Sequence, residues 1–320
     1  MARTINSMLR WRELSVIVVA VVLAIYFQIA NANFLLSNAS LQNLSQFIAP
    51  VALIACGEVI LMIGGEIDLS AGMVYALAPF LMYFLTRAGL PAPLAIVGAL
   101  AGAAAVGAVN GMVTVLLQVP SFVTTLGMLF LLNGLTLTIS GGTPVGVDAS
   151  PTLAFIMGRG GYAEFVWAAL VVLVMHFMLR NTRWGLHTIA AGANPVGASE
   201  AGIRTRELKM VNFVISGALA GLTGILEAFR ISSIDPTAGG THIMFLAVAA
   251  AVIGGTPLAG GSGTIAGAMI GAMVLGILND GFTLIGINAF TFDLILGGAI
   301  LVAMLCNILI GRYRRRMAVS

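Results

Sequence analysis

Acidic side chains inside long apolar runs are the residues of this sequence that are best placed to do chemistry. Glu58, Glu227, Asp280 and Asp293 all lie within such runs. Ionisable groups in apolar segments commonly handle protons, ions or polar solutes, because an unpaired charge there is costly. Glu227 has Arg230 three residues later, a spacing that predicts a mutual ion pair. Glu58 and Asp293 have no such neighbour, which leaves a proton relay or a hydrogen bond inside the protein.

Two more acids lie in a break between apolar runs, at residues 63–72, where Glu66, Asp68 and Ser70 follow a pair of glycines. Such a stretch is costly in lipid, so we expect an irregular backbone that is shielded by protein or lines a wet cavity. Asp68 or Ser70 is also suited to cap a helix beginning near residue 71, and a capped broken helix can serve as a gate. A second break, 253–263, repeats the Ile-Gly-Gly start and suggests an internal repeat of the kind transporters use.

Other chemistry is missing from the sequence. Lys209 is the only lysine, and no phosphate-binding P-loop motif occurs, so any ATP must be handled by a partner. His176, His187 and His242 are scattered without the ligand spacing of a metal site. Gly261-Ser262-Gly263 lacks the pattern of a nucleophile elbow. We therefore expect no catalytic residue, no metal site and no cofactor in this chain.

The composition indicates which elements must position these residues. Of the 320 residues, 59% are hydrophobic and 8% are charged, against about 25% charged residues in a soluble domain. This excludes a soluble enzyme and leaves room for about ten transmembrane helices of about 20 residues. The net charge is +3, but basic residues stand at the ends of apolar runs rather than in one stripe, which argues against nucleic acid as a partner. The prediction is an all-α polytopic membrane protein with one transmembrane domain over 1–320.

The apolar runs predict the spans and their direction. With a cytoplasmic N-terminus, twelve of the fifteen basic residues fall inside, including those of the cytoplasmic loop 180–209 and the basic tail 311–320. This is the asymmetry of the positive-inside rule, and it makes both termini cytoplasmic. The longest external loop is then 140–162. We expect the first run to be an uncleaved anchor, although residues 30–32 resemble a signal-peptide cleavage site. The predicted spans are 14–30, 45–64, 72–86, 92–117, 122–139, 163–179, 210–230, 244–255, 263–287 and 290–310.

A short capped helix is predicted in the cytoplasmic loop. Asn194 suits the N-cap, Pro195 the first helical position and Gly202 the left-handed position after the helix, so residues 195–201 should be helical. A short helix of small residues at the membrane surface is well shaped to dock in a groove of another protein. The alternative is a well-capped connecting turn.

Four blocks together resemble one known family. They are residues 67–72 (IDLSAG), 119–127 (VPSFVTTLG), 192–203 (GANPVGASEAGI) and 254–263 (GGTPLAGGSG). Their order and spacing resemble those in the permease subunit of bacterial ABC importers of the ribose, galactose and arabinose type. The resemblance runs from about Phe34 to Arg312.

The resemblance implies a protein of the bacterial inner membrane, embedded in lipid, that works with several partners. A second permease subunit, identical or related, would complete the pathway. Two ATPase subunits would use ATP and Mg²⁺, and a periplasmic binding protein would deliver a monosaccharide or related small polar solute. The ATPase-coupling helix would comprise Gly192, Asn194, Pro195, Ala198, Glu200, Gly202 and Ile203.

We assign polar and aromatic residues of the breaks and spans to the translocation pathway or gate. The chain departs from the family pattern at Glu66, where the family tends to have glycine, and at Met244, where it usually has glutamate. The polarity of the pathway therefore differs, and a nucleoside, a polyol or a furanone-like signal are alternative substrates. A secondary transporter driven by ions through intramembrane acids is the alternative function, and a passive channel is a third. The assigned residues are Glu66, Asp68, Ser70, Phe122, Thr124, Thr125, Asn279 and Asp280.

Overall fold

Nine apolar helices occupy the positions of the first nine predicted spans. The computed structural model describes residues 12–288 and the single positions 291, 294, 295, 297, 298, 301, 302 and 305. The tenth predicted span, Asp293 and the basic tail 311–320 lie outside the described residues, apart from those positions. The nine helices are α2 (Arg12–Ala30), α3 (Asn38–Ile63), α4 (Ala71–Arg87), α5 (Ala92–Leu116), α6 (Ser121–Ser140), α8 (Ala163–Asn181), α11 (Thr205–Ile231), α12 (Gly240–Ile253) and α13 (Ile265–Leu284).

Six of these helices are long and apolar enough to cross a membrane, and three others are apolar but shorter. Both breaks are present, because α3 and α4 are separated at 64–70 and α12 and α13 at 254–264. The prediction of an all-α membrane protein with broken helices is confirmed to this extent. The β structure of residues 12–288 is one antiparallel pair of two-residue strands, β1 (Val145–Gly146) and β2 (Ser233–Ile234).

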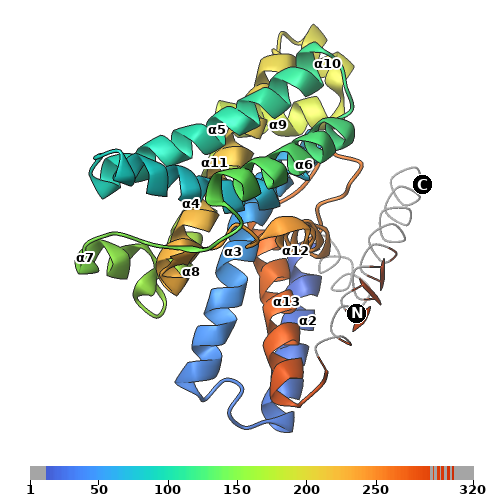
Figure 1. Cartoon of the computed structure of the whole chain (residues 1–320). Helices are drawn as coiled ribbons and strands as arrows, with labels where there is room; N and C mark the ends of the chain where they lie inside the picture. The colour runs from blue at the N-terminus through green and yellow to red at the C-terminus, as the bar shows by residue number, and fades with distance from the viewer. Residues whose placement is uncertain are drawn as a thin grey trace, which may run out of the picture.

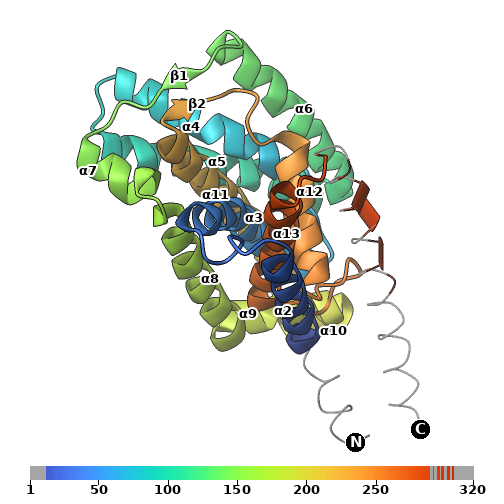
Figure 2. The same cartoon turned by 90° about the horizontal axis from the view of Figure 1, so that it is seen from below.

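Helix α3 lies at the centre of the bundle (Figures 1 and 2). Its residues from Ala49 to Ile63 are all buried, and it packs against α8, α11, α12 and α13. The peripheral helices α5, α6 and α8 instead expose large apolar side chains such as Val97, Phe130 and Leu173. That surface is suited to lipid, because a lipid environment carries no penalty for exposed hydrocarbon.

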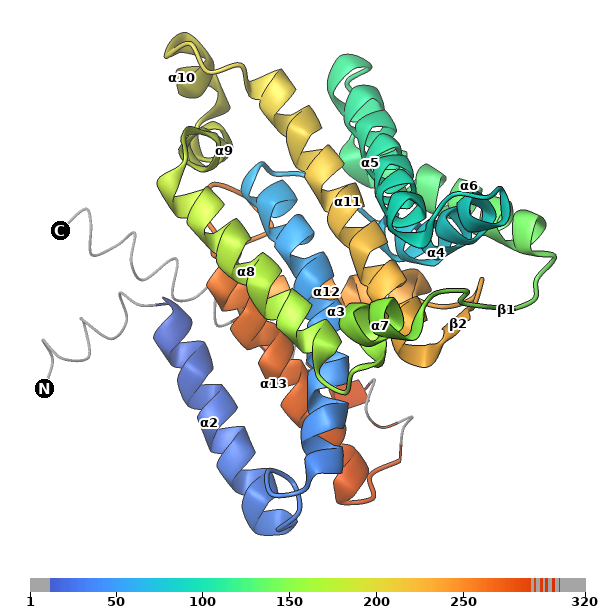
Figure 3. The ribbon, with the colours of Figure 1, turned by 90° about the vertical axis from the view of Figure 1, so that its left-hand side faces the viewer.

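The segments predicted to be external meet at one end of the bundle. The predicted loop 140–162 contains two helical pieces that the sequence did not indicate, α7 (Pro151–Ala154) and the π-helical η1 (Phe155–Arg159). β1 pairs with β2, and the Tyr162 hydroxyl donates to Asn38 Oδ1 at 2.6 Å. The predicted cytoplasmic loop is also mostly helical, with α9 (Arg183–Ala193) and α10 (Pro195–Glu200). Figure 3 shows α9 and α10 at the end of the molecule away from α7 and β1.

Glycines let α11 approach α4 and α5 closely. A Cβ added at Gly224 would overlap the carbonyl oxygen of Tyr75 in α4, and one at Gly217 would meet the carbonyl of Ala103 in α5. The small-residue spacing Gly217-x3-Gly221 therefore lies in a helix interface. Lipid supplies no hydrophobic drive for helices to associate, so backbone contact of this kind replaces it.

We expect Gly224→Ala to destabilise the protein and Gly127→Ala to leave it unchanged or slightly more stable. The added methyl group at 224 forces α11 away from α4, an overpacking cost on the order of 1–3 kcal/mol. Among the described residues, Gly127 in α6 has nothing within 4 Å of its hypothetical Cβ, and alanine is the better helix former. The melting temperatures of the two variants in the same detergent check this, and equal values would contradict the packing described.

Candidate functional site

The same turn ends both helices that precede the breaks. After α3, the Gly65 amide donates to the Met62 carbonyl at 3.0 Å and the Glu66 amide to the Leu61 carbonyl at 2.9 Å. Gly65 has φ +76°, the left-handed conformation that glycine adopts without strain. After α12, Gly255 and Thr256 form the equivalent bonds to Val252 and Ala251, both at 2.9 Å, and Gly255 has φ +94°. The repeated Ile-Gly-Gly sequence thus has the same local structure at both positions.

Asp68 is the hub of a buried polar cluster in the first break. Its Oδ1 accepts the Ser70 amide at 2.9 Å, the Ser70 hydroxyl at 2.6 Å and the Asn110 side-chain amide at 3.4 Å. The Asn110 amide also donates to the Ser70 hydroxyl oxygen at 2.8 Å. Ser70 occupies the N-cap position of α4 but makes no side-chain cap bond. The predicted capping role is therefore replaced by a turn that Asp68 organises.

Helix α6 fixes the other side of the same break. The Ile67 amide donates to the Ser121 hydroxyl oxygen at 3.3 Å, and the Leu69 amide to Thr125 Oγ1 at 3.1 Å. The Thr125 hydroxyl in turn donates to the Ser121 carbonyl at 2.8 Å. The irregular backbone is shielded by protein, as predicted, because side chains of α5 and α6 satisfy its polar groups.

Glu58 also faces this cluster from within α3. It is fully buried, and its Oε2 accepts the Asp68 amide at 3.4 Å, while its Oε1 has no partner in the part of the chain that the structure describes. Within the described residues, no lysine or arginine forms an ion pair with Glu58 or Asp68. Two roles were left open for Glu58, a proton relay and a hydrogen bond inside the protein, and the structure shows the hydrogen bond. A buried carboxyl group without water depends on such bonds.

The structure brings some predicted gate residues together and separates others. Asp68, Ser70 and Thr125 lie in the cluster, Glu66 adjoins it, and Thr124 is partly buried beside it with an unpartnered hydroxyl. Phe122 points away and is 55% exposed. Sequence reasoning missed Asn110 and Ser121. Asn110 is the one asparagine in the apolar run 92–117, and an amide inside such a run is a signal that could have identified it.

Asn279 and Asp280 do not belong to the cluster. Asp280 Oδ2 accepts the Ser40 hydroxyl at 2.5 Å. Ser40 lies near the start of α3, whereas Glu58 lies near its end, so roughly 27 Å of helix separates them. The structure therefore places Asp280 near the opposite end of α3 from Asp68, a separation that the sequence could not indicate because it does not show which end of α3 meets α13.

The predicted pair of Glu227 and Arg230 is confirmed and is part of a larger cluster. The Arg230 guanidinium binds both carboxylate oxygens of Glu227 and also donates to Gln46 Oε1 at 3.2 Å. Its Nε lies 3.4 Å from the buried Glu164 carboxylate. Arg230 thus joins α3, α8 and α11, which supports a structural role for this group.

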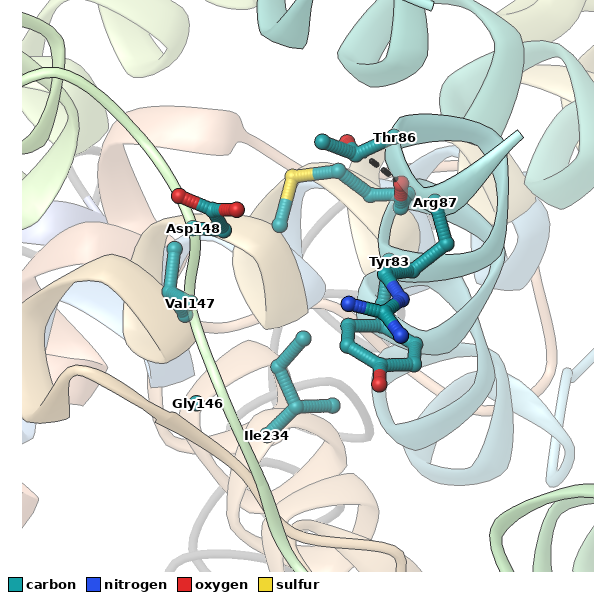
Figure 4. A pocket seen from close by; sticks show the side chains of 8 residues that line it. Tyr83, Thr86, Arg87, Gly146, Val147, Asp148 and Ile234 are labelled. Carbon is teal, nitrogen blue, oxygen red and sulfur yellow. Dashed lines mark hydrogen bonds between the residues drawn. The ribbon is translucent and has the colours of Figure 1, made fainter. Parts of the chain in front are cut away.

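A hollow lies between α4 and the β1 segment, at the end of the molecule predicted to be external. Tyr83, Thr86 and Arg87 of α4 face Asp148 and Ile234 across it (Figure 4). It is far from the Asp68 cluster, because Arg87 ends the helix that Ser70 precedes. None of the predicted site residues lines it.

Helix α10 forms as the cap signals predict, and one residue shorter. Asn194 Oδ1 accepts the Gly197 amide at 3.0 Å, and Gly202 has φ +84°. Ala198, which the resemblance places in the coupling helix, is 6% exposed and packs inward. Val196, which the sequence analysis did not select, is 68% exposed, and Glu200 is also exposed. A single apolar side chain held outward on a short rigid helix is the feature best suited to contact another protein.

The end of α9 touches the first break directly. A Cβ at Gly192 would overlap the carbonyl oxygen of Ile63, the last residue of α3. The same carbonyl accepts the Gly261 amide from the second break at 2.9 Å. Close backbone contact therefore joins both breaks to the segment that leads into α10.

Comparison with known proteins agrees with this arrangement. Residues 40–305 match the family described as "Branched-chain amino acid transport system / permease component". The chain is 36% identical to the xylose/arabinose import permease of Sulfolobus acidocaldarius over 95% of this chain and 86% of that protein. It is 36% identical to the ribose import permease of Escherichia coli over 92% of each. The autoinducer 2 import permease of Photorhabdus luminescens is 29% identical over 90% of this chain and 84% of its own length. No solved structure matches the chain.

Proposed function

Because this chain belongs to the permease-component family of the branched-chain amino acid transport system type, we propose that it is the translocation subunit of an ATP-driven sugar importer. It is an inner-membrane transport component and not an enzyme. In the proposed importer, a separate ATPase supplies energy from ATP and Mg²⁺, and a periplasmic binding protein delivers the solute. Two permease subunits, identical or related, enclose the pathway.

The observation that carries the ATPase coupling is the exposed face of α10. The chain has no nucleotide-binding motif of its own. It presents Val196 outward from a helix that is capped at Asn194 and terminated at Gly202. A rigid apolar projection loses little conformational entropy on binding, so it is suited to a partner's groove.

The proposed substrate class is a pentose. The relatives named above import ribose or xylose and arabinose, and the chain covers almost their full lengths. A third relative imports autoinducer 2, so a furanone-like signal is the first alternative, followed by a nucleoside or polyol.

In the proposed cycle, closure of the ATPase dimer displaces α10 and the adjoining ends of α9 and α11. The two breaks beside Ile63 then rearrange, and the permease pair alternates between outward-open and inward-open states. The Asp68 cluster supports this role because it binds the irregular backbone through side chains of three helices, so that helix movement changes the break.

Reconstitution tests the proposal. Proteoliposomes would contain this permease together with an ATPase and a binding protein from the same organism, and labelled D-ribose, D-xylose or L-arabinose. Uptake is expected only when ATP is present on the side of the membrane that carries the ATPase. An ATPase whose P-loop lysine is replaced is the control. Uptake by the permease alone under a proton or sodium gradient would instead establish a secondary transporter, and unsaturable passive flux would indicate a channel.

A further inference from the structure

The only lysine of the chain is bound to the acid that departs from the family pattern. Lys209 Nζ lies 2.5 Å from Glu66 Oε1. The side chains are 27% and 14% exposed, respectively. Lys209 is one turn into α11, and Glu66 directly follows the turn that ends α3. This ion pair therefore joins the helix that follows α10 to the first break, across 143 residues of sequence.

The segments before and after α10 both contact the first break. The segment before α10 reaches it through Gly192, whose backbone lies against the Ile63 carbonyl. The segment after α10 reaches it through Lys209 and Glu66. A displacement of α10 has two routes to the break through these contacts, since α9 ends just before α10 and α11 follows it after residues 201–204.

Glu66 is also next to the hydrogen bonds that fix the break. The Ile67 amide binds Ser121 of α6, and Asp68 binds Ser70 and Asn110. A shift of the Glu66 backbone therefore acts on the starts of α4 and α6. A partly buried pair is suited to transmit such a shift, because solvent screens it less than a surface pair and separating it leaves a poorly solvated charge.

We propose that Lys209 and Glu66 are positioning residues that transmit movement of the α10 region to the first break during the transport cycle. This inference rests on the proposed function, because it requires an ATPase that moves α10. Neither side chain contacts the solute in this proposal. The pair acts through the break, and charge attraction rather than residue shape is the property that matters.

The test follows a thiol in the break rather than solute uptake. Ile67→Cys is introduced into a chain carrying Cys56→Ala and Cys306→Ala, and the complex with the ATPase is purified. The rate at which a maleimide labels residue 67 is measured with and without ATP, Mg²⁺ and vanadate. We expect the nucleotide to change this rate by about tenfold, a usual size for coupling between two sites. Glu66→Gln or Lys209→Met should abolish that change while ATPase binding persists.

Two further variants separate charge coupling from misfolding. The double exchange Glu66→Lys with Lys209→Glu should restore the nucleotide-dependent change, which a merely destabilised protein would not regain. Glu207→Gln removes the exposed pair between Arg204 and Glu207 and should leave the change intact. A nucleotide response that survives in Glu66→Gln and Lys209→Met, or that is absent from the parent complex, would overturn the inference. Failure of the parent chain to bind any ATPase would instead contradict the proposed function.

Discussion

Replacing Val196 by glutamate is expected to abolish binding of the proposed ATPase and with it ATP-driven uptake. Val196 is 68% exposed on α10, so the substitution leaves the permease interior untouched. An interface that buries this position would have to bury an unpaired carboxylate, which is strongly unfavourable. Truncating a hot-spot residue at the centre of an interface typically costs about 2 kcal/mol or more, so we expect a loss of at least about 30-fold in affinity. The affinity is measured by titrating the purified ATPase onto the permease in nanodiscs.

Two comparison variants make this result specific. Val196→Ile keeps an apolar side chain and should retain binding. Ala198 lies two residues from Val196 but is buried. Ala198→Glu should therefore lower the melting temperature of the permease itself, whereas Val196→Glu should not. If Val196→Glu binds the ATPase with unchanged affinity, α10 is a connecting turn and the proposed coupling site is elsewhere.

Replacing Asp68 by alanine is expected to collapse the first break and stop uptake. The substitution removes the acceptor for the Ser70 amide, the Ser70 hydroxyl and the Asn110 amide. Each buried donor left unsatisfied costs about 1–3 kcal/mol. Asp68→Asn keeps one acceptor oxygen and should be milder. The melting temperature and the ATP-driven uptake rate should therefore both fall in the order wild type, Asp68→Asn, Asp68→Ala.

Neighbouring threonines of α6 provide a matched control for this prediction. Thr125→Val leaves the Leu69 amide without its acceptor and should cost about 1–3 kcal/mol. Thr124→Val removes a buried hydroxyl that has no partner among the described residues and should be neutral or stabilising. Equal stability of the two valine variants would contradict the proposed role of these bonds in shaping the break.

Features encoded locally were predictable from the sequence. The spans follow from long apolar runs, and their bounds differ from those observed mainly at helix starts such as α3 and α11, whose first turns are polar. Helix α10 follows from Asn194, Pro195 and Gly202, because a cap acts within one turn of its own residue. Glu227 and Arg230 pair because they are three residues apart.

Contacts between distant segments were not predictable in the same way. The inward face of Ala198 depends on how α10 packs, which no local pattern encodes. Asp68 meets Asn110 across 42 residues, and Asp280 meets Ser40 across 240. Without knowing which helix ends adjoin, acids in different spans look alike, so Asp280 was assigned to the same pathway or gate as Asp68, although the two lie near opposite ends of α3. Glu66 was conspicuous in the sequence, but its partner Lys209 emerged only from the fold.

Site-specific photocrosslinking at residue 196 tests most directly whether this chain couples to an ATPase. A benzophenone amino acid would be placed at 196, and at Val97 of α5 as an apolar, exposed control, in native membranes that also contain the ATPase. We predict a crosslink between residue 196 and the ATPase subunit that depends on illumination and is absent at residue 97. An ATP-hydrolysing complex that gives no ATPase crosslink from residue 196 would contradict the proposed coupling.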